Sequence, residues 1–443
     1  MNLATLRRKW LAPLFLFEIY LSLTVVMFFF GPWPWEAKNP ILLAIYLITA
    51  QLCIVGGYLL AWNKTLRLYK AENELSQYLP GGIIFLKRAL LVTFILLIPT
   101  SLSRTGALLP NIFNGLTDAG ASYTGNFERL EGGNAFVLIE YLRMLMSPFL
   151  IAVFPLTIVY WTQLTVRTRL LSLITIFFNL SLYISTGTNK GVADVIVTLP
   201  LLVYLGIAAG VLKLRVSKKF LIVVFVVALF AFLQFFGMGQ TQRGGNVGEF
   251  GIFNSGLGLL DADKKHPVSV LLSDSQRIIF ESLARYIGQG YYALSLCFNI
   301  EHSSTFGFGH SMFLARNADA VFNTTSFTFG SFPGLLERQS GWGMFTLWHS
   351  IYPWLASDFG FIGTLLVIGF FSYLLGLNWG RSLLTLDPRS IALTYLLVIL
   401  FFYIPANNQI FQSGETCVAF FILLIGLVIR KRVRYQSRQP KFI

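Results

Sequence analysis

The sequence predicts an all-α polytopic integral membrane protein with about ten transmembrane helices, within a range of 10 to 14. Of its 443 residues 55% are hydrophobic and 12% are charged, and the mean hydropathy is +0.66. A soluble domain carries about 25% charged residues. Apolar runs recur along the chain, most of them close to the roughly 20 residues that a helix needs to cross a bilayer. One long polar stretch, residues 237–352, interrupts these runs and predicts a large helical loop outside the bilayer.

Ten apolar segments account for the predicted spans. In chain order they are Leu11–Phe30, Ile41–Trp62, a segment from Ala89 to Leu102 or beyond, Ala135–Trp161, a segment from Leu170 to the turn at Ser185, Val192–Val211, Phe220–Phe236, a segment within Ile351–Leu377, Ile391–Ile404 and Thr416–Ile429. The first run resembles a secretory signal, but no small-residue cleavage site follows it, so we interpret it as an uncleaved span.

These spans divide the chain into three parts. Residues 1–236 form an N-terminal transmembrane bundle that includes an outer loop at 103–134. Residues 237–352 form the large loop, which we place on the outer side of the membrane. Residues 353–443 form the C-terminal transmembrane helices and a basic cytoplasmic tail.

The distribution of charge predicts the orientation. The net charge is +14, and most of the 34 Lys and Arg residues lie in the two termini and in four basic connectors, 63–88, 162–169, 211–219 and 379–389. Lys and Arg accumulate on the cytoplasmic side of membrane proteins. Both termini are therefore predicted to be cytoplasmic, and the two long polar loops face outward. The positive net charge is explained by the membrane topology, so no nucleic-acid partner is expected.

Several charged side chains lie inside or at the ends of apolar runs, where they usually face a partner or a cavity. Glu140 and Arg143 are three residues apart, so they either neutralise each other on one helix face or belong to an active site. Lys190 and Asp194 form a similar i, i+4 pair in the segment TGTNKGVAD.

Arginines are frequent in the predicted outer loops, including Arg104, Arg277, Arg285 and Arg338. Arginine binds phosphate through two parallel hydrogen bonds, so an outward cluster would suit a pyrophosphate at the membrane surface. The alternative is ordinary salt bridging and interfacial anchoring. Arg104 and Arg277 each precede a glycine by eleven positions, which gives the spacing R-x10-G once in each outer loop.

The end of the large loop reads HSIYPWLASDFGFIG, from His349 to Gly363. A histidine with an ordinary pKa near 6.5 can accept a hydroxyl proton at neutral pH. His349 is therefore a candidate base, or else an interfacial histidine. Asp358 is either part of the same site or a helix N-cap. Asp261 and Asp263 resemble a metal-binding pair, but the adjoining Lys264 and Lys265 oppose a cation, and no metal site is predicted.

The order of these motifs on this topology resembles the Wzy-type O-antigen polymerases, in a wider superfamily that includes the O-antigen ligases. STGTNKGVADVI is similar to the family's turn-plus-helix element, although Lys190 stands where arginine is more usual. The paired R-x10-G spacing is similar to a pattern of some polymerases. Gly307–Ser311 and the stretch from His349 to Gly363 are similar to the segment that closes the large loop. In ligases this histidine position is the catalytic one, whereas polymerases often lack it.

The resemblance implies a GT-C-like, metal-independent glycosyltransferase without a cofactor, in the bacterial inner membrane with its active site facing the periplasm. Its substrate would be an undecaprenyl-pyrophosphate-linked oligosaccharide, and its partners membrane lipid and a chain-length regulator protein. The expected catalytic residues are His349, Asp358 and Arg277. The expected pyrophosphate-binding or substrate-binding residues are Arg104, Arg143, Lys190, Arg285, Arg338 and Tyr286. An O-antigen ligase and a polysaccharide flippase or other transporter are the alternatives.

Overall fold

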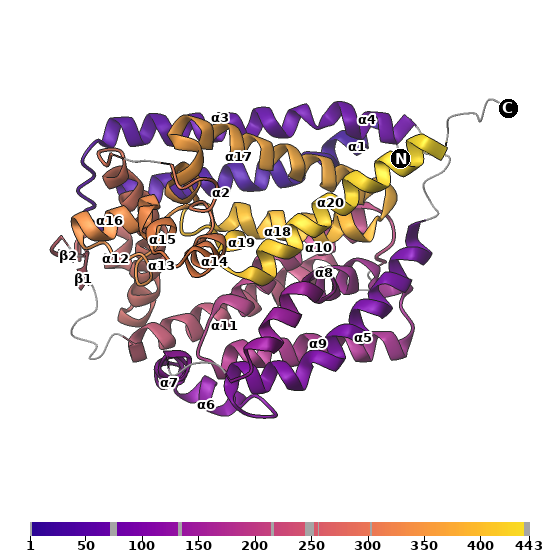
Figure 1. The fold of residues 1–443 in the computed structure, drawn as a ribbon, viewed down its shortest axis with the longest axis horizontal. Helices are drawn as coiled ribbons and strands as arrows, with labels where there is room; N and C mark the ends of the chain where they lie inside the picture. The colour runs from indigo at the N-terminus through magenta and orange to yellow at the C-terminus, as the bar shows by residue number, and fades with distance from the viewer. Residues whose placement is uncertain are drawn as a thin grey trace.

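The computed structural model describes residues 2–70, 78–131, 135–213, 217–243, 252–255, 257–301 and 304–437 (Figure 1). Its helices are α1 (Leu3–Trp10), α2 (Ala12–Phe30), α3 (Pro40–Leu60), α4 (Trp62–Lys70), α5 (Tyr78–Thr105), α6 (Ile112–Thr117), α7 (Ala119–Glu131), α8 (Val137–Tyr160), the 3-10 turn η2 (Trp161–Gln163), α9 (Val166–Ser185), α10 (Lys190–Ala208), α11 (Lys218–Arg243), α12 (Pro267–Leu271), α13 (Asp274–Cys297), α14 (Met312–Phe322), α15 (Ser326–Gly330), α16 (Phe332–Ser340), α17 (Ile351–Thr385), α18 (Pro388–Tyr403), α19 (Gln409–Gln412) and α20 (Gly414–Ser437).

Helices long and apolar enough to cross a membrane dominate the described chain. Eight satisfy both criteria by length and composition, and the apolar helices Pro388–Tyr403 and Gly414–Ile429 are shorter. Each of the ten apolar segments predicted from the sequence overlaps one of these helices, and the bounds differ by a few residues. The predicted all-α, multi-pass membrane fold class is therefore confirmed.

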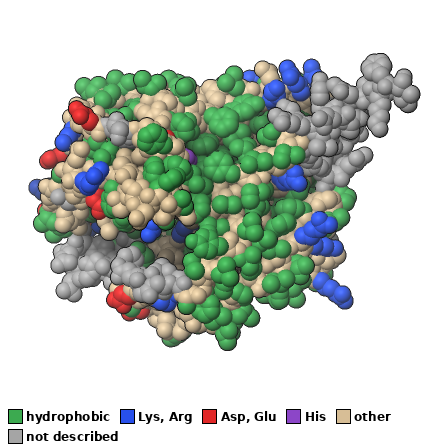
Figure 2. Space-filling model, viewed as in Figure 1, with side chains coloured by type: hydrophobic (Ala, Val, Ile, Leu, Met, Phe, Trp, Pro, Cys, Tyr) green, Lys and Arg blue, Asp and Glu red, His purple; other side chains and the backbone are tan. Residues whose placement is uncertain are grey.

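The two chain ends and the large loop lie at opposite ends of the long axis of the molecule. In Figure 1, α1 and the C-terminal end of α20 lie at one end, and α12, α16 and the strands lie at the other. Figure 2 shows hydrophobic side chains over the long helices and acidic side chains gathered at the end that holds the loop. The seventh span, α11, continues to Arg243, beyond the predicted end at Phe236. The last residues of the predicted cytoplasmic tail, 438–443, lie outside the described residues, as do 244–251 of the large loop.

The described part of the large loop is mainly helical, with one small exception. Strands β1 (Ile252–Asn254) and β2 (Leu259–Asp261) form an antiparallel hairpin in which Phe253 lies opposite Leu260. The sequence did not predict this hairpin, because each strand is only three residues long.

Helix α13 fastens the loop into the transmembrane core. The Tyr291 hydroxyl lies 2.9 Å from the Thr24 hydroxyl of α2, and the indole nitrogen of Trp33 donates to the Glu281 carbonyl at 2.8 Å. A Cβ on Gly290 would lie 2.0 Å from the carbonyl oxygen of Pro405, so the backbones touch there. The loop therefore shares its core with the apolar helices.

Helix α17 is bent at Gly360, whose φ of 65° and ψ of 171° are not helical. This backbone region is accessible essentially only to glycine. The glycine thus separates a short first part of the helix, which carries Asp358, from the long apolar part.

Helices α3 and α17 pack through small residues, as membrane helices commonly do. A Cβ on Gly57 would lie 1.9 Å from the carbonyl oxygen of Gly369, and the Ser372 hydroxyl donates to the Ile54 carbonyl at 2.7 Å. A Cβ on the neighbouring Gly56 would have no other atom within 4 Å. Only one of two consecutive glycines is therefore required by the helix contact.

We predict that Gly57→Ala destabilises the protein and Gly56→Ala does not. The added methyl at position 57 must push α3 away from α17, and overpacking of this kind costs about 1–3 kcal/mol. The measurement is the thermal unfolding midpoint of the purified variants in detergent micelles. Equal midpoints for the two variants would contradict the close contact.

Candidate functional site

One carboxylate oxygen joins three helices at the centre of the candidate site. Oε2 of Glu415, in the first turn of α20, lies 2.7 Å from Nη2 of Arg143 on α8 and 3.1 Å from Nη2 of Arg104 on α5. Arg143 is 4% exposed and also donates to the Thr100 hydroxyl at 2.7 Å. Two guanidinium groups therefore share one anionic oxygen.

Glu140 completes the ion-pair cluster from the first turn of α8. Its Oε2 lies 3.1 Å from Nη2 of Arg104, and the Ser103 hydroxyl donates to its Oε1 at 2.8 Å. Its predicted partner Arg143 is more distant, at 3.9 Å from Nε. The i, i+3 pair predicted from the sequence exists, but both residues bind more closely to groups on other helices.

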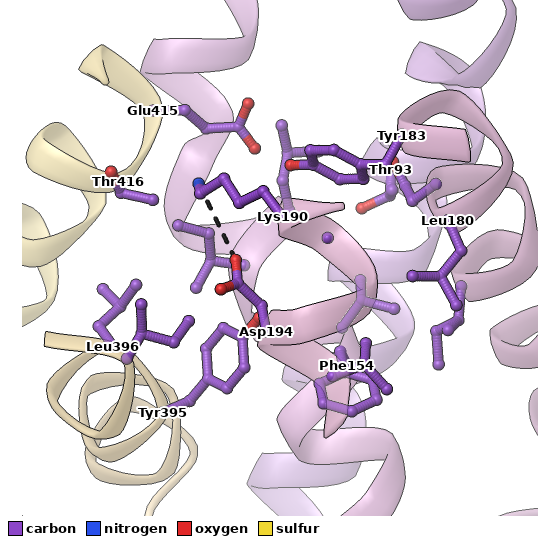
Figure 3. A pocket seen from close by; sticks show the side chains of 18 of the residues that line it. Thr93, Phe154, Leu180, Tyr183, Lys190, Asp194, Tyr395, Leu396, Glu415 and Thr416 are labelled. Atoms are coloured by element: carbon purple, nitrogen blue, oxygen red, sulfur yellow. Dashed lines mark ion pairs between the residues drawn. The ribbon is translucent and has the colours of Figure 1, made fainter. Parts of the chain in front are cut away.

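Lys190 and Asp194 extend the cluster along α10. Nζ of Lys190 lies 3.9 Å from Oδ2 of Asp194, which confirms the predicted i, i+4 pair. In Figure 3 the Lys190 ammonium points between Asp194 and Glu415, and Tyr183 lies across from it. Tyr395 and Phe154 lie deeper in the same pocket. Three cations and three carboxylates thus gather from four helices.

Two cavities meet at this cluster. The smaller, about 140 Å³, extends from Arg104 and Lys190 to apolar side chains such as Phe154 and Leu396. The larger, about 400 Å³, is lined by Glu140 and by Phe313 of α14. Both are lined by Arg104, Tyr183, Lys190, Glu415 and Thr416. The shared lining is therefore polar, whereas the residues that line only the smaller cavity are mainly apolar.

Local structure explains why these groups converge. Helices α8, α10 and α20 all begin here, and a helix N-terminus carries partial positive charge that favours anions. Glu140 and Glu415 lie in first turns, as that field favours. Gly187, with φ of 62°, lets the turn before Lys190 pass over α7, because a Cβ there would lie 2.3 Å from the Ala119 carbonyl oxygen.

The outer loop at 103–134 is tied to the same cluster by Arg129 of α7. One guanidinium nitrogen donates to the Ser103 carbonyl at 3.0 Å, and another donates to the Arg104 carbonyl. Cationic side chains stabilise the last carbonyls of a helix in this way. The loop therefore fixes the end of α5 that presents Arg104.

The other predicted cations lie elsewhere in the described structure. On α13, Arg277 pairs with Asp274 at 3.2 Å and with Glu281 at 3.8 Å. Arg285 lies over the rings of Trp33 and Phe253, and burial lowers its pKa. None of these residues lines either cavity.

Two further predicted substrate contacts also lie outside the cavities. Tyr286 packs against Phe236 and Trp348, at ring distances of 5.5 and 5.4 Å. Arg338 donates to the Phe329 carbonyl at 2.7 Å. A role for them in substrate binding stays a prediction.

The R-x10-G spacing has a packing explanation at its glycines. A Cβ on Gly115 would lie 2.0 Å from the Ile184 carbonyl oxygen, and one on Gly288 would lie 2.3 Å from the indole nitrogen of Trp35. Both glycines allow close approach of another segment. Their arginines differ, because only Arg104 belongs to the cluster.

His349 lies in an aromatic environment away from the cluster. It is 2% exposed, and its ring centre is 6.5 Å from that of Trp342 and 6.2 Å from that of Trp354. Neither ring nitrogen has a well-formed hydrogen bond, and burial lowers the pKa of the imidazole to about 3. His349 is neutral at pH 7, and a role as the catalytic base stays a prediction.

Asp358 has a different partner from the one that its spacing suggested. Its Oδ2 lies 2.8 Å from Nδ1 of His310, and the carboxylate also accepts hydrogen bonds from the segment 305–310. The Asp358 carboxylate therefore holds the loop before α14 in place through hydrogen bonds.

Sequence reasoning missed Glu415, the side chain that bridges the two arginines. The signal available was a carboxylate directly before the last apolar run, at Thr416–Ile429. Tyr183 and Tyr395 were also missed, because a tyrosine within an apolar segment carries no distinguishing pattern.

Comparison with known proteins adds no family assignment. No protein-family model matches the chain, and neither the curated proteins nor the solved structures include a significant match. Within the part of the chain that the structure describes, no group of three or more His, Cys, Asp and Glu side chains is placed to hold a metal ion.

We predict that His349 makes the stability of the protein depend on pH. Because folding lowers its pKa to about 3, the unfolded chain binds the proton more readily between there and the ordinary pKa near 6.5. From this group the free energy of unfolding should fall by about 1 kcal/mol between pH 6.5 and 5.5, and by about 1.4 kcal/mol for each further pH unit until the folded pKa is approached. Denaturant unfolding at pH 6.5 and 5.5 measures the slope, which should flatten in His349→Phe. An unchanged slope in that variant would contradict the assignment.

Proposed function

We propose that this protein polymerises undecaprenyl-pyrophosphate-linked oligosaccharide repeat units into O-antigen polysaccharide. The reaction would occur at the periplasmic face of a bacterial inner membrane, in a GT-C-like fold. The chemistry follows the family that the sequence motifs resemble. The observation that carries the proposal is the convergence of Arg104, Arg143 and Lys190 on two joined cavities, the smaller of which is lined mainly by apolar residues beyond those that the two share. This arrangement suits an amphiphile with an anionic head and an apolar tail.

In the proposed step, an acceptor hydroxyl oxygen attacks the anomeric carbon of the growing chain. A new glycosidic C–O bond forms, and the C–O bond to the lipid pyrophosphate breaks. The hydroxyl proton passes to a protein base, and the departing lipid pyrophosphate carries the negative charge. Arg104, Arg143 and Lys190 would stabilise that charge as it develops.

Glu415 indicates how the arginines receive the pyrophosphate. Its Oε2 contacts Nη2 of both Arg104 and Arg143, and a phosphate oxygen could make the same two contacts. The three cations are balanced by Glu140, Asp194 and Glu415, so a pyrophosphate must replace at least one carboxylate. In the resting protein, the carboxylates would keep the guanidinium groups oriented for this exchange.

A transporter is the second candidate, and charge balance is the observation that favours it. A neutral ion-pair cluster in a membrane bundle can exchange its partners with a bound substrate or proton. Prolines lie inside α5 at Pro99, α8 at Pro148 and Pro155, and α10 at Pro200. Proline inside a helix removes a backbone hydrogen bond and favours a kink, but these helices are continuous. Against this, the charged groups lie near the ends of these helices.

We predict that Arg104→Ala and Lys190→Ala lose polymerisation, while Lys38→Ala retains it. Loss of one group that stabilises a developing anion costs about 10²–10³ in rate. Lys38 is exposed in the connector between α2 and α3 and provides the matched loss of one positive charge. Purified proteins are incubated with a synthetic lipid-linked repeat unit, and the products are resolved as a chain-length ladder.

The outcomes separate the candidate functions. A wild-type protein that forms no ladder but moves the lipid-linked repeat across a vesicle membrane would contradict the polymerase and support the transporter. A null strain that accumulates bare lipid A-core, rather than core with one repeat unit, would identify a ligase. Normal ladders from both site variants would reject the site while leaving the function in place.

A further inference from the structure

Asp358 holds a histidine in a defined orientation at the start of α14. Its Oδ1 accepts hydrogen bonds from the Thr305 hydroxyl at 2.5 Å and from the Gly307 amide at 2.9 Å. Its Oδ2 accepts from the His310 amide at 2.8 Å and lies 2.8 Å from Nδ1 of the same residue. The carboxylate is 3% exposed. Since a carboxylate accepts hydrogen bonds, Nδ1 carries the proton and Nε2 presents a lone pair.

The other ring nitrogen is left available. The hydrogen bonds of His310 to residues that the structure describes involve its backbone and Nδ1 and not Nε2, and the side chain is 15% exposed. The ring packs against Phe411 at 5.8 Å and against Phe359 at 5.9 Å between centroids. A carboxylate that fixes one nitrogen while the other stays open is the arrangement by which enzymes orient a histidine base.

The backbone around the carboxylate is strained. Phe306 has φ of 55° and Gly307 has φ of 87°, and Phe306 is 82% exposed. A non-glycine residue in this region costs of order 1–3 kcal/mol and persists where surrounding contacts determine it. Here the determining contacts are those of segment 305–310 with Asp358. Anchoring of the loop explains three of the four contacts, but it does not require an imidazole with an open Nε2.

His310 lines neither cavity, but the chain leads from it into the wall of the larger one. The side-chain amide of Asn408 donates to the His310 carbonyl at 2.6 Å, and three residues after His310 comes Phe313, which lines that cavity. Three residues span at most about 11 Å, so the Cα atoms of His310 and Phe313 lie within that distance. Phe313 in turn packs on Gly414, beside Glu415. The inference requires an oligosaccharide bound at the arginines to extend past Phe313 as far as the imidazole.

We infer that His310, positioned by Asp358, is the general base that accepts the proton of the acceptor hydroxyl. The inference rests on the proposed polymerase function. The O–H proton moves to Nε2 as the new glycosidic bond forms and the bond to the lipid pyrophosphate breaks, and the imidazolium then releases it to water. In this role we replace His349, which is 2% exposed between two tryptophans, by a histidine whose side chain is 15% exposed.

The decisive pair of variants is His310→Asn and His310→Gln. The asparagine amide nitrogen can take the place of Nδ1–H toward Asp358, so the loop contact is kept while Nε2 is lost. The His310→Gln variant also lacks the basic imidazole. Both should reduce the rate of ladder extension by about 10²–10⁴, because general base catalysis is removed. His266→Asn is the matched control, because His266 caps α12 through Nδ1 and lies outside both cavities, and it should extend the ladder as the wild type does.

Folding and lipid-linked substrate binding are measured alongside the rate. His310→Asn should keep the wild-type unfolding midpoint and the wild-type Kd for the lipid-linked repeat unit. A wild-type rate in this variant, with the ladder intact, would overturn the base while leaving the polymerase in place. Absence of a ladder from the wild-type protein would instead overturn the proposed function.

A second measurement applies even where the variants do not fold. Diethyl pyrocarbonate modifies open imidazole nitrogens in the folded wild-type protein, and mass spectrometry locates the modified histidines. Loss of ladder extension should follow modification of His310 and be unaffected by that of His266. A protein modified at His310 that still extends the ladder at the wild-type rate would reject the inference.

Discussion

The contact between Glu415 and two arginines is the constraint on which the rest of the site depends. A guanidinium group that is 4% exposed, as Arg143 is, must have an anionic partner close by, because an unpaired buried charge is strongly destabilising. Glu415 supplies that partner from the start of α20, at 2.7 Å. The same oxygen reaches Arg104 at the end of α5. The contact therefore fixes the relative positions of three helices at one depth.

Once those helix ends meet, the remaining features follow from their geometry. The N-termini of α8, α10 and α20 point their positive ends toward one region, which would attract an anion even without side chains. Glu140, Asp194 and Glu415 balance the three positive charges of Arg104, Arg143 and Lys190. A neutral but highly polar cluster is stable in an apolar surrounding. It can still bind an anionic substrate, because an incoming anion can exchange with a carboxylate. The same property is needed by a glycosyltransferase and by a transporter.

Sequence reasoning located the spans well, because each span is a local property of about 20 consecutive residues. It also found Lys190 with Asp194, which share one helix. It did not find Glu415 opposite Arg143, since 272 residues separate them and only helix packing brings them together. In the same way, Asp358 was assigned with His349 from proximity in the sequence, whereas in the fold it binds His310, which is 48 residues away.

The bend at Gly360 explains why the end of the large loop and the membrane helix act as one unit. It ends the short first part of α17 just after Asp358, so the carboxylate is held by a helix that is anchored in the core through Trp354 and Leu355. The loop segment 305–310 then wraps around a fixed point, and α14 begins from it and carries Phe313 to the cavity. A shift of α17 would consequently move His310 and one wall of the cavity together. A single helix, α17, can thus fix the position of a histidine from the loop relative to the cations from the first half of the chain.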